Sequence, residues 1–284
     1  MCGRFWENMG FNKAIVTIAV GKRFNRMVNK ICRENWELYA AKYGYDLIVI
    51  DEQPDNSELG KSRCVAWQKC LILSQKWSNK YERIVWIDTD ILINPNAPDI
   101  CDEIPEDKIG AVNEFTSPTR ESYNLALSRM YEHWTNLKYK PVINYGAKEY
   151  YKSFGIDCDF EDVVQTGVIV FNPKIHKEIL ENVYYNYEEK GLNYEMRPLS
   201  YEILKSGMIH WIDNRFNTLL QFQKALYYPF LLELKKEKLP LFGQNKIKKL
   251  CIDAVFANSY FLHFTGKTEE MSLLNWKKFI NQVI

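Results

Sequence analysis

The segment RIVWIDTD, residues 83–90, joins a short apolar run to two aspartates. Its first five residues are typical of a buried parallel strand. Alternate side chains of an extended chain share a side, so we expect Asp88 and Asp90 to point together and Thr89 to point away. Two such carboxylates can hold a hard divalent cation, Mg²⁺ or Mn²⁺, and leave its other positions for water or phosphate oxygens. An acidic strand-to-loop junction without a ligand is the alternative.

The sequence before this segment alternates between strand and helix patterns. Strands are predicted over residues 13–20 and 46–50, and helices over residues 24–43 and 62–77, the first helix ended by Gly44. This order predicts a parallel sheet with right-handed crossovers, whose ligands gather at the carboxyl ends of the strands. Asp88 and Asp90 lie at one of those ends.

After this segment the pattern is less regular. The sequence predicts strands over residues 109–113, 163–171, 209–212 and 260–264, and helices over residues 117–138, 176–189 and 198–205. No repeat or linker divides the chain. We therefore expect one α/β domain over residues 1–284, with a mixed, mostly parallel central sheet.

Composition excludes several classes of protein. The 284 residues are 46% hydrophobic and 26% charged, with a net charge of +1, so neither disorder nor binding to nucleic acid is indicated. The seven cysteines form no Cys-x-x-Cys pair and are expected to be reduced thiols. No apolar run approaches the roughly 20 residues of a membrane span, and residues 1–12 lack a signal-peptide pattern, so we expect a cytoplasmic protein. Its oligomeric state is not indicated.

Five fragments, in this order along the chain, carry a family resemblance. They are IVWIDTDIL (84–92), QTGVIVFN (165–172), EMRPLS (195–200), RFN (215–217) and HFTGK (263–267). Over residues 13–267 the chain resembles the GT-A glycosyltransferases, whose fold is a Rossmann-like domain for nucleotide-diphospho-sugars. It is most similar to the retaining family 8, which includes lipopolysaccharide galactosyltransferases and glycogenin, with some likeness to family 34. The resemblance implies a nucleotide-binding half over residues 13–115 and an acceptor-side half over residues 116–284 that completes the metal site.

The resemblance also implies a UDP-sugar donor and a Mn²⁺ or Mg²⁺ ion. Asp90 and His263 are the implied direct ligands, and Asp88 would bind the ion indirectly or contact the ribose. A neutral imidazole suits such a site. For His263 the alternative is an interior histidine satisfied by a backbone hydrogen bond.

Further residues are implied to contact the donor. Lys69 matches a basic residue that the family points at the donor, although a surface lysine is the alternative. Gly266 would let the backbone approach the diphosphate and Lys267 would place a charge on it, but the family places this lysine later and follows it with Pro-Trp. The whole set is Ala19, Val20, Gly21, Arg63, Lys69, Asp88, Thr89, Thr166, Gly167, Gly266 and Lys267.

Glu195 and Gln165 are the residues implied to act beside the sugar. Where the family has Asp-Gln, this chain has Glu195-Met196, and methionine cannot hydrogen-bond a sugar as glutamine can. The identity of the donor sugar is therefore left open. The resemblance implies transfer of a hexose or pentose to a hydroxyl of a glycan or glycolipid with retention, through front-face attack assisted by the leaving phosphate. A catalytically decayed nucleotide-sugar or glycan-binding protein is the alternative, whereas nucleotidyltransferases and phosphohydrolases lose support because their motifs are missing.

Residues 235–249 form a lysine-rich stretch with interspersed apolar residues. A solvated surface is the default interpretation. The alternative is peripheral contact with the anionic inner surface of a membrane, which would bring the protein to a lipid-linked acceptor.

Overall fold

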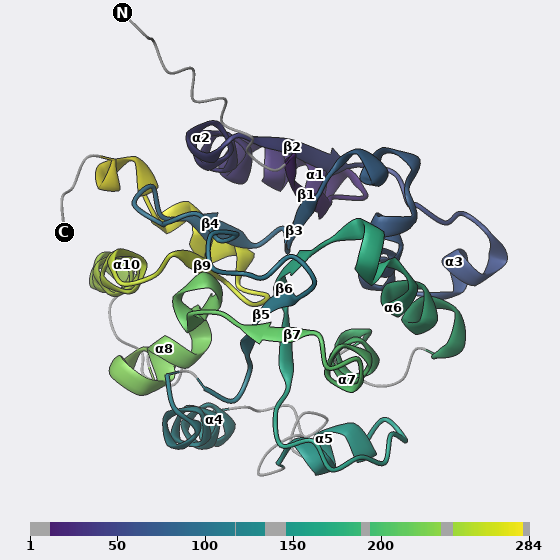
Figure 1. Cartoon of the computed structure of the whole chain (residues 1–284). Coiled ribbons are helices and arrows are strands. Elements are labelled where there is room, and N and C mark those ends of the chain that lie inside the picture. Colours follow the sequence, from purple (N-terminus) through teal and green to yellow (C-terminus); the bar gives the residue numbers. More distant parts are fainter. Residues whose placement is uncertain (1–11, 117, 134–145, 189–193, 234–240, 281–284) are drawn as a thin grey trace, which may run out of the picture.

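The computed structural model describes residues 12–116, 118–133, 146–188, 194–233 and 241–280 (Figure 1). Its central sheet has six strands in the order β2-β1-β3-β6-β5-β7. β6 is antiparallel to β3 and β5, and the other three pairings are parallel. This confirms the expected α/β domain with a mixed, mostly parallel sheet. The strands are β1 (Lys13–Ile18), β2 (Tyr45–Ile50), β3 (Arg83–Ile87), β5 (Ile109–Asn113), β6 (Val164–Phe171) and β7 (Ile209–Trp211).

A second sheet of three short strands joins distant parts of the sequence. Its order is β4-β9-β8, formed by β4 (Ile91–Ile93), β9 (Phe261–His263) and β8 (Thr218–Leu219). Ile91 pairs with His263 in the antiparallel β4–β9 ladder, and the N–H of Phe264 donates to the carbonyl of Asp90 at 2.9 Å. The register of this sheet therefore places His263 beside the residues that follow β3.

Helices and 3₁₀ segments cover both faces of the central sheet (Figure 1). The α-helices are α1 (Lys22–Met27), α2 (Arg33–Tyr43), α3 (Glu58–Ser62), α4 (Arg120–His133), α5 (Ala147–Lys152), α6 (Pro173–Asn186), α7 (Met196–Lys205), α8 (Leu220–Tyr227), α9 (Phe230–Glu233) and α10 (Leu241–Ala257). A π-helical turn, η1 (Val28–Cys32), links α1 to α2. The 3₁₀ segments are η2 (Val65–Ser74), η3 (Lys76–Lys80), η5 (Asn214–Asn217), η6 (Thr268–Leu273) and η7 (Trp276–Phe279).

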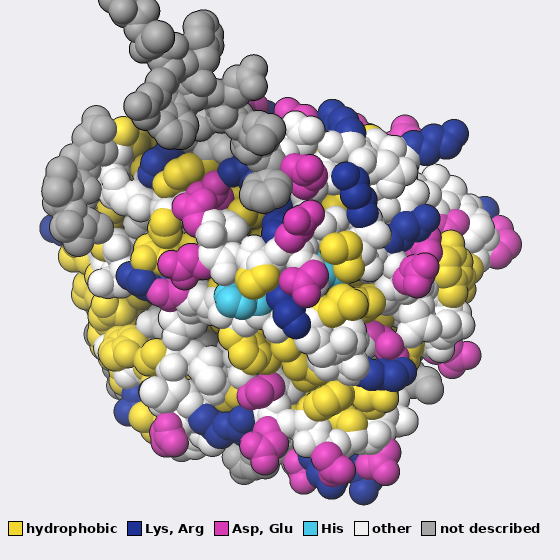
Figure 2. Space-filling model, in the orientation of Figure 1, with side chains coloured by type: hydrophobic (Ala, Val, Ile, Leu, Met, Phe, Trp, Pro, Cys, Tyr) yellow, Lys and Arg dark blue, Asp and Glu magenta, His cyan; other side chains and the backbone are white. Residues whose placement is uncertain are grey.

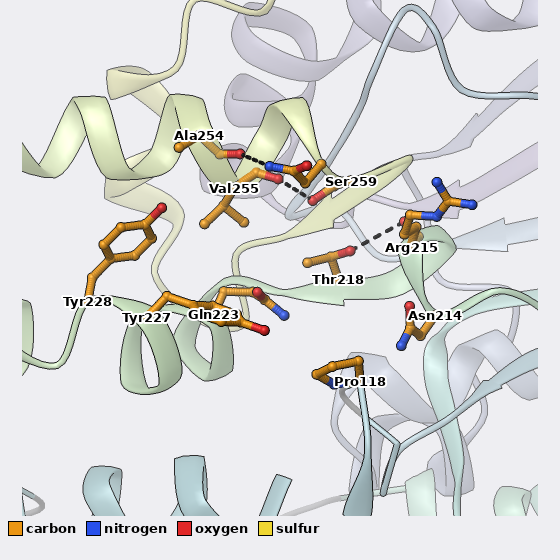
Figure 3. A pocket seen from close by; sticks show the side chains of 11 residues that line it. Pro118, Asn214, Arg215, Thr218, Gln223, Tyr227, Tyr228, Ala254, Val255 and Ser259 are labelled. Atoms are coloured by element: carbon orange, nitrogen blue, oxygen red, sulfur yellow. Dashed lines mark hydrogen bonds between the residues drawn. The ribbon is translucent and has the colours of Figure 1, made fainter. Parts of the chain in front are cut away.

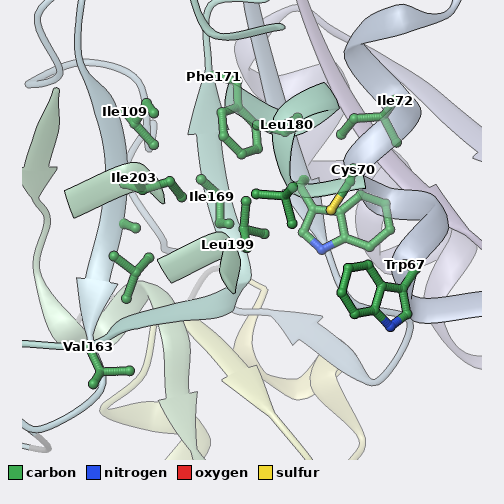
Figure 4. Close-up of a cluster of buried hydrophobic side chains, with 14 of the residues drawn as sticks. Trp67, Cys70, Ile72, Ile109, Val163, Ile169, Phe171, Leu180, Leu199 and Ile203 are labelled. Carbon is green, nitrogen blue, oxygen red and sulfur yellow. The ribbon is translucent and has the colours of Figure 1, made fainter. Parts of the chain in front are cut away.

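The alternation of side chains along β3 divides the core into two clusters. Ile84 and Trp86 join the cluster that includes residues of η2, α6 and α7 (Figure 4), while Val85 and Ile87 join the one that includes residues of α2 and α10. A strand buried on both faces is expected to be apolar throughout. This explains why residues 83–87 read as a continuous apolar run.

The predicted helix over residues 62–77 is wrong. Two 3₁₀ segments, η2 and η3, occupy most of this region. Every residue from Trp67 to Leu73 is buried, including Gln68 and Lys69, so the segment has no solvated face. The prediction relied on the spacing of apolar residues in an amphipathic helix, which buries one face. A segment buried on all sides does not show that spacing.

The other predicted elements are present, most of them with shifted ends. The helix expected over residues 24–43 corresponds to α1 and α2 with the π turn between them, and it ends at Gly44, whose φ of 73° is left-handed. Asn172 caps α6, because its side chain accepts from the N–H of Lys174, and Pro173 takes the first helical position. The strands β4 and β8 and the helices α3, α5, α8, α9 and α10 were not predicted.

Several predictions fall partly outside the described residues. These parts are residues 1–11, residues 117 and 134–138 of the helix predicted over 117–138, residue 189 of the helix predicted over 176–189, and residues 235–240 of the lysine-rich stretch. The rest of that stretch begins α10. In the described parts of the chain, every helix is too short or too polar to cross a bilayer. On the face shown in Figure 2, acidic and basic side chains are interspersed, in agreement with the net charge near zero.

Candidate metal centre

Asp88, Asp90 and His263 converge at the carboxyl end of β3. Nε2 of His263 lies 3.1 Å from Oδ1 of Asp90 and 3.9 Å from Oδ2 of Asp88. One ligand atom from each residue lies within 4.8 Å of the other two. Thr89 and Asp90 form a turn and not the extended segment that we expected, yet both carboxylates face the same imidazole. Two carboxylate oxygens and one imidazole nitrogen are a ligand set suited to Mn²⁺ and similar divalent ions.

The second oxygen of each aspartate is engaged by the protein. Oδ1 of Asp88 accepts from the indole Nε1 of Trp86 at 2.9 Å and from Nζ of Lys69 at 3.1 Å. Oδ2 of Asp90 accepts from the N–H of Gly266 at 3.0 Å. These contacts fix the rotamers of both carboxylates and leave Oδ2 of Asp88 and Oδ1 of Asp90 facing His263.

The ring of His263 is oriented by Asn217. Nδ1 of His263 lies 2.9 Å from Oδ1 of Asn217, and Nδ2 of Asn217 donates to Oε1 of Gln165 at 2.6 Å. Because the amide nitrogen of Asn217 donates to Gln165, its oxygen faces the imidazole and Nδ1 carries a proton. Metal-binding histidines commonly donate their second N–H in this way. Nε2 is thus the ring nitrogen aimed at the two carboxylates.

Gly167 makes room for that ring. A Cβ atom at residue 167 would lie 2.6 Å from Cε1 and 2.7 Å from Nδ1 of His263. Its N–H donates to Oε1 of Gln165 at 2.5 Å, and its carbonyl accepts from the N–H of Asp88 at 2.9 Å. The glycine of the QTG fragment therefore packs against the histidine and also bonds to the backbone of the first aspartate.

The charges of His263 and Asp90 are strongly coupled. Burial works against ionisation of Asp90, but the charge and hydrogen bond of His263 and the N–H of Gly266 lower the pKa of this carboxyl to about 2. Burial also lowers the pKa of His263, but the charges of Asp90 and Asp88 outweigh burial and raise it. The metal-free site therefore favours an imidazolium beside a carboxylate, and a divalent cation would take the place of that proton.

Lys69 lies beneath the metal centre, in contact with Glu195. Its Nζ is 2.8 Å from Oε1 of Glu195, 3.1 Å from Oδ1 of Asp88 and 3.2 Å from the carbonyl of Thr166, and the Lys69 and Glu195 side chains are 7% and 4% exposed. Burial lowers the pKa of Lys69, but the charges of Asp88 and Glu195 outweigh it and raise the pKa. The structure thus joins Lys69, Glu195 and Thr166 in one buried network next to Asp88.

The remaining residues predicted to bind the donor are placed as follows. Ala19, Val20 and Gly21 follow β1, which runs parallel to β3, so they lie at the same edge of the sheet as Asp88. The carbonyl of Thr89 accepts from Sγ of Cys32 at 3.4 Å. Lys267 has a side chain that is 38% exposed, and its Nζ lies 4.0 Å from Oε1 of Glu269.

Arg63 lies against α6 and not against the metal centre. Its guanidinium donates to the carbonyls of Tyr184 and Tyr187 and stacks over the ring of Trp67, 4.7 Å from the ring centroid. These contacts attach the start of η2 to the end of α6.

Two residues of the site were not predicted as members. Asn217 lies in the RFN fragment, which could have pointed to it. Glu114 follows β5, and its Oε2 is buried without a hydrogen-bond partner among the described residues. Burial raises the pKa of Glu114 to about 7, although the charge of His263 and the hydrogen bond from Tyr123 oppose that shift. A carboxylate directly after a buried strand is the signal that could have identified it.

Comparisons with known proteins agree with this architecture. No protein-family model matches the sequence, and no curated protein matches it either. Among solved structures, a glycosyltransferase involved in the glycosylation of the major capsid of PBCV-1 is 15% identical and has a TM-score of 0.53, with 93% of this chain and 100% of that chain covered. The galactosyltransferase LgtC is 10% identical, with a TM-score of 0.46 and coverage of 95% and 94%. Mouse xyloside xylosyltransferase 1 is 11% identical, with a TM-score of 0.45 and coverage of 91% and 99%.

At such low sequence identity these similarities concern the fold, and only the first has a TM-score above 0.5. The strand order, the second small sheet and the convergence of Asp88, Asp90 and His263 are consistent with that fold. The chain has the GT-A fold of nucleotide-sugar glycosyltransferases.

Proposed function

We propose that this protein is a metal-dependent glycosyltransferase that moves a hexose or pentose from a UDP-sugar to a hydroxyl of a glycan or glycolipid, with retention. The observation that carries the proposal is the cluster of Asp88, Asp90 and His263, whose ligand atoms lie within 4.8 Å of one another. The other polar atom of each side chain is bonded elsewhere in the protein, so these three atoms are held toward one another. Their place at the carboxyl edge of a GT-A sheet is where such folds bind ligands.

The donor set suits Mn²⁺ or Mg²⁺, and better Mn²⁺, because imidazole is a less favourable ligand for the harder Mg²⁺. Asp88, Asp90 and His263 would hold the ion, which when bound supplies Lewis-acid stabilisation of the departing UDP. Ala19, Val20 and Gly21 are proposed to contact the nucleotide, and Gly266 and Lys267 to approach the diphosphate.

The surroundings of Glu195 and Gln165 favour front-face attack over a protein nucleophile. Glu195 is buried and paired with Lys69, and Oε1 of Gln165 already accepts from Gly167 and Asn217. A carboxylate held in an ion pair is a poor nucleophile. In the proposed reaction the acceptor hydroxyl attacks the anomeric carbon from the side on which UDP departs, and an oxygen of the leaving phosphate takes its proton.

A catalytically decayed binding protein is the second candidate. Met196 supports it, because a thioether stands where the family has an amide that can bond to the sugar. This candidate predicts metal-dependent nucleotide binding without turnover, so one series of measurements separates the two functions.

Calorimetry with UDP, with and without Mn²⁺, tests the metal centre, and slow hydrolysis of a panel of UDP-sugars tests turnover without a known acceptor. We expect Mn²⁺-dependent UDP binding in the native chain and its loss in Asp90→Ala and His263→Ala. Matched controls are Asp159→Ala, whose side chain is 92% exposed, and His210→Ala on β7; both should bind like the native chain. Native protein that binds no UDP with Mn²⁺ would refute the glycosyltransferase function, and binding without hydrolysis would favour the decayed protein.

A further inference from the structure

A cavity of about 430 Å³ lies between η5, β8, α8 and the end of α10 (Figure 3). We call it the η5–α10 cavity. Its lining includes Asn214, Thr218, Gln223, Tyr227, Asn258 and Ser259. None of these residues has a role in the metal centre or in the proposed donor site.

Three polar side chains of the cavity each donate one hydrogen bond to a backbone carbonyl. Nδ2 of Asn214 donates to the carbonyl of Thr116 at 3.1 Å, and Nδ2 of Asn258 donates to the carbonyl of Ala254 at 2.9 Å. Oγ of Ser259 donates to the carbonyl of Val255 at 2.7 Å. Each bond fixes a side chain and leaves oxygen lone pairs, and each asparagine amide keeps a second N–H. The cavity therefore offers fixed hydrogen-bond acceptors and donors, which suit a ligand with many hydroxyl groups.

Aromatic and amide groups complete the lining. Tyr227 is 59% exposed and Tyr228 is partly buried, so both can offer ring surface to a ligand. The amide of Gln223 makes no hydrogen bond to the other cavity residues drawn in Figure 3, and it can donate as well as accept. Rigid tyrosine faces beside neutral hydrogen-bonding groups suit sugar rings, which combine apolar C–H faces with hydroxyl edges.

The cavity carries little net charge. Arg215 is the charged residue in its lining, and its guanidinium is paired with Asp213 at 2.6 Å and stacked over Tyr260 at 4.1 Å from the ring centroid. A phosphate or a peptide carboxylate would find a cation that is already neutralised. A neutral saccharide therefore fits the lining better than an anion does.

The backbone connects this cavity to the metal centre. Asn217 and Thr218 are adjacent in sequence, and the side chain of Asn217 bonds to His263 while Thr218 lines the cavity. In the same segment, Leu219 pairs with His263 in the β8–β9 ladder. A glycan seated in the cavity would therefore lie next to the segment that supports the metal ligands.

We propose that the η5–α10 cavity binds a neutral sugar residue of the acceptor glycan, one that is not itself glycosylated. The role as acceptor rests on the proposed glycosyl transfer, but saccharide binding at the cavity requires neither metal nor nucleotide. The cavity would thus favour oligosaccharide acceptors over monosaccharides.

Saturation-transfer NMR in EDTA, without nucleotide, tests the binding with lactose, maltotriose and N,N′,N″-triacetylchitotriose as probes. We expect at least one probe to bind the native chain and Asp90→Ala equally well. Tyr227→Ala and Gln223→Ala should each weaken the binding of that probe at least fivefold. Tyr185→Ala is the matched control, because this tyrosine of α6 is 61% exposed and does not line the cavity. Thermal unfolding of each variant confirms that the fold is retained.

Kinetics supply the second readout. With an oligosaccharide acceptor, the two cavity variants should raise the KM for the acceptor and leave hydrolysis of the UDP-sugar unchanged. The proposal is overturned if no probe binds the native chain, if both cavity variants bind as it does, or if 3′-sialyllactose binds more tightly than lactose. Saccharide binding that is lost in the cavity variants, in a protein without Mn²⁺-dependent UDP binding, would keep the cavity assignment and refute the glycosyltransferase function.

Discussion

The imidazole of His263 fills the space that a side chain at Gly167 would need. An added Cβ would lie 2.6 Å from Cε1 of the ring, closer than real Cβ atoms approach other heavy atoms. The ring is 6% exposed and bonded to Asn217, so it has little freedom to move away without losing its orientation. Gly167 thus contributes to the metal centre through the volume that it leaves empty.

Gly167→Ala should therefore weaken Mn²⁺-dependent UDP binding at least tenfold, because the displaced ring no longer directs Nε2 at the aspartates. Overpacking of this kind typically costs about 1–3 kcal/mol of unfolding free energy. Calorimetry and urea unfolding measure the two effects. Gly243→Ala in α10 is the control: its Cβ meets nothing within 4 Å, and it should stabilise the fold by about 0.5–1 kcal/mol. Native affinity in Gly167→Ala would contradict the packing argument.

Asn217→Ala should lower Mn²⁺ affinity roughly 10- to 100-fold without removing a ligand, since it deletes the acceptor that orients Nδ1 of His263. Asn217→Asp keeps an acceptor for Nδ1 of His263 but loses the donor to Gln165, so it should recover part of the affinity, which a merely structural role would not predict. Asn186→Ala, at an exposed position of α6, is the control. Mn²⁺ titration followed by UDP binding measures all three. Equal affinities in the alanine and aspartate variants would exclude the orienting role.

Sequence reasoning identified the parts of this site that depend on local pattern and order. The RIVWIDTD segment was recognisable because its strand is buried on both faces, and the HFTGK fragment supplied the distant histidine. The contacts of Lys69 and Asn217 were not predictable, because they depend on which side of a segment faces the core. In η2 every residue from Trp67 to Leu73 is buried, so no periodicity marks Lys69 as an interior cation.

Lys69→Met should destabilise the protein strongly, because it leaves the buried Glu195 without its cation. Breaking one partner of a buried ion pair typically costs about 3–5 kcal/mol. The double variant Lys69→Met/Glu195→Gln removes the orphaned charge and should recover part of that loss. Urea unfolding measures the free energies.

Lys61→Met is the matched control for that experiment. Lys61 pairs with Glu58 at 2.8 Å, but the two side chains are 63% and 93% exposed, so its loss should change stability by no more than about 0.5 kcal/mol. Similar costs for Lys69→Met and Lys61→Met would contradict the importance of burial for the Lys69–Glu195 pair.

Glu114 should make the stability of the metal-free protein depend on pH. Burial raises the pKa of its carboxyl from 4.5 to about 7 in the folded chain. Below pH 4.5 both the folded and the unfolded chain hold this proton, and Glu114 makes its full contribution to the free energy of unfolding. As pH rises from 4.5 to about 7, the unfolded chain releases the proton while the folded chain keeps it, so the free energy of unfolding falls. Above pH 7 the contribution is lost.

Glu114→Gln removes this titration, because the amide is uncharged at every pH. Urea unfolding in EDTA between pH 4.5 and 8 should show the glutamine variant gaining stability over the native chain as pH rises, with the gain levelling off above pH 7. Effects of His263 and the other titrating groups are present in both proteins, so they largely cancel in the difference between the two free energies of unfolding. Glu37→Gln, at an exposed position of α2, is measured in the same series as the control for loss of a surface carboxyl. If the stability difference between Glu114→Gln and the native chain were constant with pH, Glu114 would not be held protonated by burial, and its unpartnered oxygen would need another explanation.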